Sequence, residues 1–75
     1  MSVSLEQQYL KALSKRIVEI RKQNGFTQER LANESGIDRV ALAYIESGKR
    51  KPTVTTIFKI AIAMNVAPSD LFIDL

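Results

Sequence analysis

Four residues in the middle of the chain combine types and spacing that suit contact with DNA bases. Side chains three and four positions apart share one side of a helix, and at this spacing lie Arg39, Val40, Ala43 and Tyr44. A basic run, Lys49-Arg50-Lys51, follows shortly afterwards. A basic run alone can equally be a solvated loop. Beside a helix with such a face, however, it fits the major groove of DNA.

The segment from residue 27 to residue 46 has capping and turn residues where two short helices joined by a tight turn would need them. Thr27 and Asp38 can each cap a helix, because their side-chain oxygens accept hydrogen bonds from the free N–H groups of a first turn. Gly36 lies between them and tolerates the positive φ that this kind of turn commonly needs. We therefore predict helices over about 28–35 and 39–47. Their inward positions are Leu31, Ala32, Leu42 and Ile45.

The remaining elements must position this pair of helices. Apolar residues at helical spacing predict a first helix over about 5–24, which Gly25 ends. Phe26 can then pack toward Arg30 or Leu31, the latter being the better partner. A fourth helix is capped by Thr53 and ends at Asn65, and Pro68 indicates a fifth within 66–75.

The expected fold is thus all-α, with five helices in a single domain that spans residues 1–75. Residues 1–10 are longer than a minimal domain requires, so they extend the first helix or cover a partner. Residues 66–75 form the last helix and an unusually apolar tail.

Composition excludes most other kinds of chemistry. The chain has no cysteine and no histidine, so it lacks disulfides, thiolate metal sites and the commonest general base. Seventy-five residues scarcely enclose a pocket. We expect no enzymatic activity, no cofactor, no metal and no small-molecule ligand. Neither a membrane-spanning run nor a signal peptide is evident, so we expect a soluble cytoplasmic protein. A net charge of +3 permits nucleic-acid binding without demanding it.

Several segments resemble the Cro/CI and XRE-like helix-turn-helix regulators. They are residues 25–32 (GFTQERLA), 35–37 (SGI) and 44–52 (YIESGKRKP), followed by 57–66 and 70–72. The resemblance implies a compact lambda-repressor-like domain in which the second and third helices form the helix-turn-helix. Through Ile37-Asp38-Arg39 and the long first helix, the chain most resembles restriction-modification controller proteins.

The resemblance also implies roles for individual residues. In this family, bases are read from the positions of Arg39, Val40, Ala43 and Tyr44, and phosphates are contacted from those of Gln28, Tyr44, Lys49 and Arg50. The arginine fork can donate to O6 and N7 of guanine, although Arg39 could instead bind a phosphate or Asp38. Tyr44 can reach a base or a phosphate, and we prefer phosphate. Gln28 can also be a plain polar residue of the first turn.

Two further expectations concern assembly. Arg21 and Glu46 match a structural ion pair between the first and third helices of family members. Candidates for a two-fold contact are the apolar residues Leu71, Phe72, Ile73 and Leu75, because large apolar patches are seldom left exposed to water. For Phe72, Ile73 and Leu75, closing the core is an equal alternative. Ile57 and Met64 are expected in the core. Ala67 replaces a usual serine or threonine cap, so the last helix is expected to be short or frayed.

The function favoured by these observations is sequence-specific transcription regulation by a homodimer on an inverted repeat of double-stranded DNA. The resemblance to controller proteins implies that the chain regulates its own promoter, activating at low occupancy and repressing at high occupancy. Two alternatives stay open. One is a phage Cro-like repressor, and the other is an antitoxin or anti-regulator whose main partner is another protein.

Overall fold

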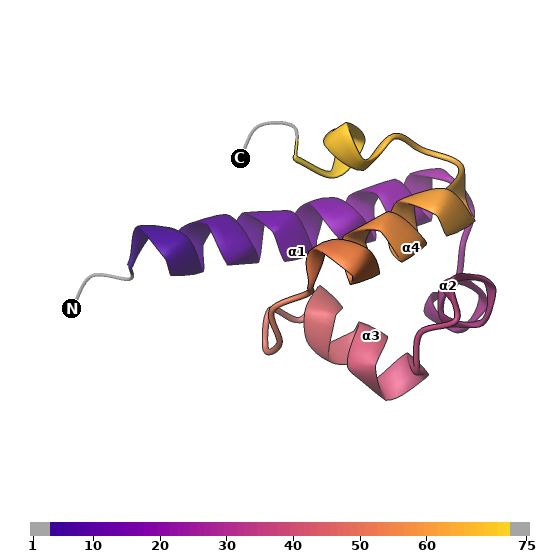
Figure 1. Ribbon diagram of the computed structural model, residues 1–75, viewed down its shortest axis with the longest axis horizontal. Helices are drawn as coiled ribbons and strands as arrows, with labels where there is room; N and C mark the ends of the chain where they lie inside the picture. The colour runs from indigo at the N-terminus through magenta and orange to yellow at the C-terminus, as the bar shows by residue number, and fades with distance from the viewer. Residues whose placement is uncertain (1–3, 73–75) are drawn as a thin grey trace.

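Four α-helices and one short 3₁₀ helix form residues 4–72, the part of the chain that the computed structural model describes (Figure 1). In chain order they are α1 (Leu5–Gln23), α2 (Gln28–Ser35), α3 (Arg39–Glu46), α4 (Val54–Met64) and η1 (Pro68–Phe72). The fold is all-α, as predicted. The four α-helices begin and end within about one residue of their predicted bounds.

The fifth predicted helix needs a correction, because η1 is a 3₁₀ helix of five residues. Ala67 precedes it, and an alanine side chain has no oxygen with which to cap an α-helix. Instead, the backbone N–H of Ala67 donates to Asp70 Oδ2 at 3.1 Å, and the N–H of Asp70 donates back to the carbonyl of Ala67 at 2.9 Å. Such bonds between residues three apart are those of a single tight turn.

Each α-helix has a side-chain cap at its first turn. Ser4, Thr27, Asp38 and Thr53 accept hydrogen bonds from backbone N–H groups two or three residues further on. The cap of α1 was not predicted, although Ser4 and Gln7 form a complete capping box whose spacing is visible in the sequence. Each such cap contributes about 1 kcal/mol of stability. Residues within one turn of each other therefore determine where these helices begin.

Each α-helix also stops at a residue in the left-handed conformation. These residues are Gly25, Gly36, Gly48 and Asn65. At the end of α2, Gly36 has a φ of 73°, and the N–H of Ile37 donates to the carbonyl of Ala32 at 3.0 Å. That geometry reverses the chain and sets the direction in which α3 leaves α2.

The five largest of the fully buried side chains make the centre of the core, and each comes from a different element. They are Ile17, Leu31, Leu42, Ile60 and Leu71. Ile57 and Met64 also lie in the core, as expected. Leu71 corrects a prediction, because it was a candidate for the two-fold contact and is instead 0% exposed within its own chain. It anchors η1, and it leaves no surface for a partner.

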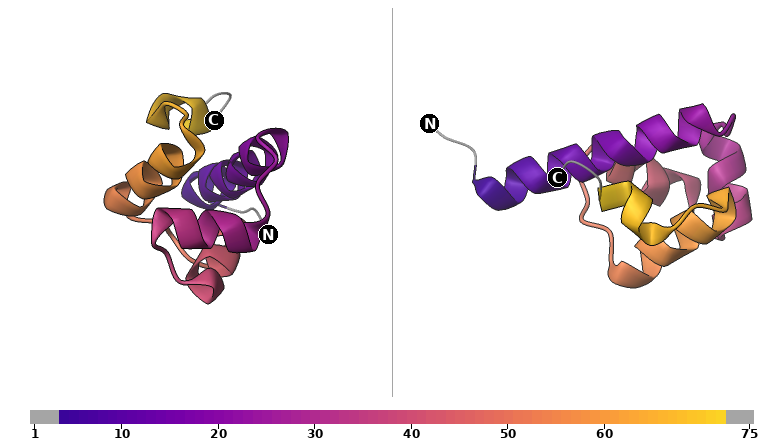
Figure 2. Two further views of the ribbon diagram at one scale, coloured as in Figure 1. Left: turned by 90° about the vertical axis from the view of Figure 1, so that its right-hand side faces the viewer. Right: turned by 90° about the horizontal axis from the view of Figure 1, so that it is seen from above.

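The elements are arranged around α1, which crosses the whole molecule (Figures 1 and 2). α1 contacts η1 and α3, η1 packs on α4, and α2 packs against both α3 and α4. Two polar contacts fasten this arrangement to α1. Arg16 Nε donates to the carbonyl of Asp70 at 2.9 Å, and the buried Ser14 Oγ donates to the carbonyl of Ile45 at 2.7 Å.

The short connection before α2 is held by an aromatic ring. Phe26 is half-buried against the core, and the guanidinium carbon of Arg30 lies 4.0 Å from its ring centroid. The structure thus records Arg30 as one of the two partners considered for this ring, and Phe26 also packs against the core cluster that contains Leu31. Arg30 is held over the ring by Glu34, one turn further along α2, at 2.7 Å. No helix within residues 4–72 is both long enough and apolar enough to cross a bilayer.

The turn at Gly36 can be tested with two substitutions. A Cβ at this position would meet no atom within 4 Å, so the cost of a side chain is conformational rather than steric. We expect Gly36→Val to lower the free energy of unfolding by about 2 kcal/mol, and Gly36→Asn by about half as much, because asparagine tolerates a positive φ. Chemical denaturation followed by circular dichroism measures both. Equal losses would show that the backbone conformation is not the cause.

Candidate nucleic-acid interface

The outer face of α3 carries the side chains predicted to read bases. Arg39 is exposed, Val40 and Tyr44 are 58% and 42% exposed, and Ala43 is half-buried. The opposite face is apolar and points inward, with Leu42 and Ile45 in the core. In Figure 1, α3 lies at the lower edge of the molecule, where no other element covers its outer side. The helix therefore presents this face to solvent.

Asp38 keeps the start of α3 accessible by bonding to the backbone. Its Oδ2 atom accepts from the N–H groups of Val40 and Ala41 at 3.0 and 3.2 Å. Within residues 4–72, no carboxylate lies within ion-pair distance of Arg39. The structure therefore does not contain the alternative contact, in which Asp38 would bind the Arg39 side chain. The guanidinium of Arg39 stays available at the exposed first position of the helix.

The end of α3 is held by the ion pair between Arg21 and Glu46. Arg21 Nε lies 2.9 Å from Glu46 Oε2, and Arg21 Nη2 donates to Glu46 Oε1 at 3.1 Å. The remaining terminal nitrogen of Arg21 donates to the carbonyl of Phe26 at 2.9 Å. Only 12% of the Arg21 side chain and 5% of the Glu46 side chain are exposed. This two-pronged contact joins α1, the turn after it and α3.

Gln28 lies at the first residue of α2, beside that ion pair. Its Nε2 donates to Glu46 Oε1 at 3.1 Å, a contact that the sequence analysis missed. The two residues are 18 positions apart, so no local pattern links them. The structure therefore gives Gln28 a partner within the protein. Its carbonyl oxygen and the second amide hydrogen take no part in that bond.

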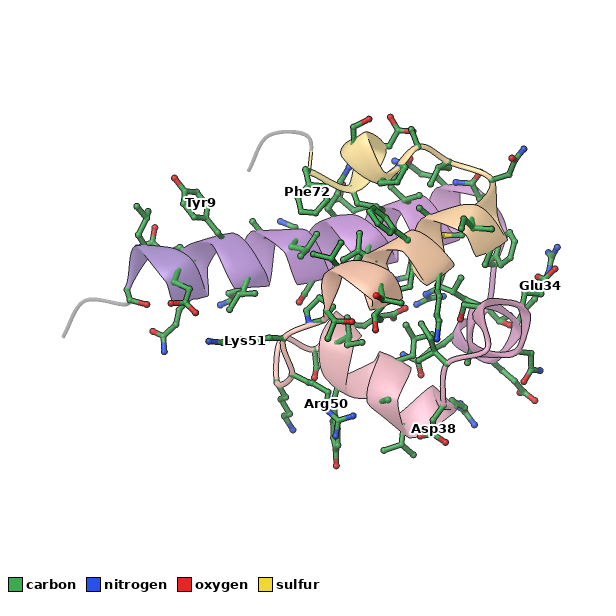
Figure 3. All side chains as sticks on the ribbon, viewed as in Figure 1. Tyr9, Glu34, Asp38, Arg50, Lys51 and Phe72 are labelled. Atoms are coloured by element: carbon green, nitrogen blue, oxygen red, sulfur yellow. The ribbon has the colours of Figure 1, made fainter. Side chains whose placement is uncertain are left out.

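The three basic residues after α3 are all exposed, but they differ in their surroundings. Arg50 stacks on the ring of Tyr44, with 5.4 Å from the guanidinium carbon to the ring centroid. Lys51 Nζ instead lies 2.6 Å from Glu6 Oε1 on α1. Figure 3 shows Arg50 extending beside α3, whereas Lys51 points toward the N-terminal turns of α1. The hydrogen bond and the charge of Lys51 lower the pKa of Glu6 below its ordinary value.

The arrangement offers hydrogen-bond donors and positive charge on one side of the molecule. Among residues 4–72, no three acidic, histidine or cysteine side chains gather as a metal ion would need. The exposed groups around α3 are the guanidiniums of Arg39 and Arg50, the phenol of Tyr44 and the ammonium of Lys49. Groups of these kinds match phosphate oxygens and base edges.

Residues 17–71 match the family model HTH_3, described as helix-turn-helix. The chain belongs to this family of DNA-binding transcription regulators. It is 41% identical over 58 residues to an HTH-type transcriptional regulator of Archaeoglobus fulgidus, covering 77% of this chain and 83% of that protein. It is also 39% identical over 62 residues to SutR of Escherichia coli, covering 83% of this chain but only 34% of SutR.

Solved structures give the same assignment. The restriction-modification controller protein C.AhdI from Aeromonas hydrophila superposes with a TM-score of 0.82 at 36% identity, over 84% of this chain and 96% of that one. The wild-type controller protein C.Esp1396I superposes with a TM-score of 0.81 at 31% identity, over 93% of this chain and 88% of that one. The XRE-like family and the likeness to controller proteins, both predicted from the motifs, are confirmed. These relatives are transcription regulators rather than enzymes.

The ion pair behind α3 can be tested by a double-mutant cycle. Removing one member of a buried pair costs about 3 to 5 kcal/mol, because the remaining charge is left desolvated. We expect Arg21→Met and Glu46→Leu each to destabilise the fold toward the lower end of that range, since part of the Arg21 side chain reaches solvent. The double variant should lose less than the sum of the two single changes. Chemical denaturation measures all three, and additive losses would contradict the coupling.

Proposed function

We propose that this helix-turn-helix protein is a sequence-specific regulator that acts in the cytoplasm as a homodimer on an inverted-repeat operator. The observation that carries the proposal is the exposed outer face of α3, whose inner face is locked into the core by Leu42 and Ile45. Each subunit lays α3 in the major groove. Two such helices reach half-sites separated by about one helical turn of DNA.

Base recognition depends chiefly on Arg39. The planar guanidinium donates two hydrogen bonds to O6 and N7 of a guanine, which discriminates against other bases by roughly 1 to 3 kcal/mol. Val40 offers an apolar surface to a thymine methyl group, and Ala43 leaves room for the DNA rather than adding a contact. Because this face has few hydrogen-bonding groups, sequence-dependent DNA shape supplies part of the specificity.

Phosphate contacts set the position of the protein on the duplex. Gln28 offers the part of its amide that Glu46 does not use, beside the exposed N–H groups at the start of α2. Tyr44 donates a hydrogen bond to a phosphate through its hydroxyl. The guanidinium of Arg50, which stacks on the Tyr44 ring, lies close to that contact. Lys49 adds a second positively charged contact, from the same loop as Arg50. These contacts hold register but carry no sequence information of their own.

The two-fold contact is assigned to the apolar surface around η1. Phe72 is 47% exposed and lies at the edge of that surface. Ile73 and Leu75, the other two candidates, lie outside the described residues. Leu71 is not part of the proposal, since it is buried in its own subunit. No small-molecule ligand or cofactor is invoked.

The controller proteins C.AhdI and C.Esp1396I suggest the kind of regulation. We propose that this chain acts on its own promoter region and responds to its own concentration. At low occupancy it activates transcription, and at high occupancy it represses. This restriction-modification controller role follows from the likeness in sequence and fold, whereas DNA reading rests on the geometry of α3.

Selection of bound sequences from a random duplex pool tests DNA recognition directly. The wild-type protein should enrich an inverted repeat with a guanine in each half-site. With Arg39→Ala, the preference at that one base pair per half-site should vanish, while the other positions stay enriched. Competition with operator variants gives the size of the loss. Retained preference for the guanine would overturn the role of Arg39.

Replacement of Lys49 tests a purely electrostatic contact. Each phosphate contact releases condensed counterions, so Lys49→Ala should reduce the salt dependence of log K by about one. Binding to all sequences should weaken alike. Filter or anisotropy titrations at several salt concentrations measure this, with Lys59→Ala on α4 as the matched control. An effect confined to one operator variant would show that Lys49 reads sequence instead.

A further inference from the structure

A row of lysines runs along α1, beside the end of α3. Lys11, Lys15 and Lys22 are all exposed, and with Val18 they follow one another at intervals of four, three and four residues. Side chains at this spacing share one face of a helix. With a rise of about 1.5 Å per residue, the row extends over about 16 Å of α1. None of the contacts described above uses these three side chains, which we call the lysine row.

Two adjoining grooves lie between the lysine row and the end of α3. The larger has a volume of about 490 Å³, and its lining includes the whole lysine row together with Val18, Glu46 and Ser47. The smaller has a volume of about 290 Å³ and is lined by Gln7, Leu10, Lys11, Ser47 and Gly48. Lys11 and Ser47 border both grooves. The two grooves therefore form one surface, which reaches from the start of the loop after α3 to the last turn of α1.

The positive charge of this surface is not neutralised by the protein. Within residues 4–72, no carboxylate lies within ion-pair distance of the lysine row. Both carboxylates in the lining are already paired, Glu46 with Arg21 at 2.9 Å and Glu19 with Arg16 at 3.7 Å. The first two lysines of the row are one helical turn apart, and like charges at this spacing repel each other. An anion that lies along the row relieves this repulsion.

Both ends of the surface adjoin elements that the proposed function places on phosphates. Gly48, which borders the smaller groove, directly precedes Lys49 in the loop. Glu46, which borders the larger groove, accepts a hydrogen bond from the amide of Gln28 at 3.1 Å. Figure 1 shows the end of α3 and the following loop directly below α1. A phosphate backbone that contacts both Gln28 and Lys49 therefore runs close to the lysine row.

We propose that the lysine row binds the phosphate backbone of duplex DNA beyond the base pairs that α3 reads. An ammonium group binds phosphate as a point charge and needs no fixed geometry. The row therefore adds affinity without reading sequence. The inference rests on the proposed function and deepens it, because it adds α1 to the phosphate contacts assigned to α2, α3 and the loop. An acidic protein segment would have the same charge, but the continuity with the phosphate-contacting elements favours DNA.

The test compares the variants Lys15→Ala and Lys11→Ala/Lys15→Ala with the control Lys59→Ala. Lys59 is an exposed lysine of α4 that lines neither groove. Each protein is titrated at several salt concentrations with two duplexes. The short duplex carries only the inverted repeat that the wild-type protein selects, and the long duplex adds about one helical turn of DNA on each side. Circular dichroism establishes that every variant is folded.

On the long duplex, the salt dependence of log K should fall by about one for each lysine removed per subunit, because each lost phosphate contact retains its counterion. Affinity for this duplex should fall about tenfold for the double variant at about 0.15 M salt. The short duplex should be bound by both variants as by wild type, because it ends before the flank. The control should match wild type on both duplexes.

An equal loss on both duplexes, a loss on neither, or a loss no larger than that of the control would overturn the inference. The inference also fails if the variants bind both duplexes normally but no longer bind poly-glutamate, since the row would then serve an acidic protein. Selection from the random pool separates this test from that of the proposed function. If wild type enriches no sequence while the variants still lower the salt dependence on a long duplex, the inference stands and the proposed function fails.

Discussion

The ion pair between Arg21 and Glu46 is the contact on which the position of α3 depends. Glu46 is the last residue of α3, and its carboxylate receives Arg21 from α1 and Gln28 from the start of α2. Three elements thus meet at one almost fully buried carboxylate. Because a buried charge without partners is costly, the three elements cannot shift independently. This contact holds α3 through Glu46 at its end. The side chains on the outer face of α3 are therefore not needed to fix the position of the helix.

The core of this domain is small, and each element contributes one large side chain that is fully buried. With so few buried residues, local interactions must contribute much of the stability. The capping residues at the start of each α-helix and the left-handed residues after each one meet this need. They also make the elements rigid units, so that a surface carried by α3 keeps its shape when the protein is free of DNA.

Two surfaces of the molecule have opposite chemistry, and this separates their roles. The side that carries α3 and the following loop offers Arg39, Tyr44 and a basic run. The surface between the first turns of α1 (residues 5–10), η1 and α4 offers almost only apolar atoms. Lys51 lies between these two surfaces, and its charge is paired with that of Glu6.

Helix bounds, caps and the outward face of α3 could be predicted from the sequence, because they depend on residues within one or two turns of each other. The contacts of Gln28 and Lys51 could not, since their partners lie 18 and 45 positions away and only the packing of the helices brings them together. Leu71 and Phe72 show the same limit. Both are large, apolar and adjacent, and only the tight turn of η1 against α1 and α4 decides that Leu71 enters the core while Phe72 stays half exposed.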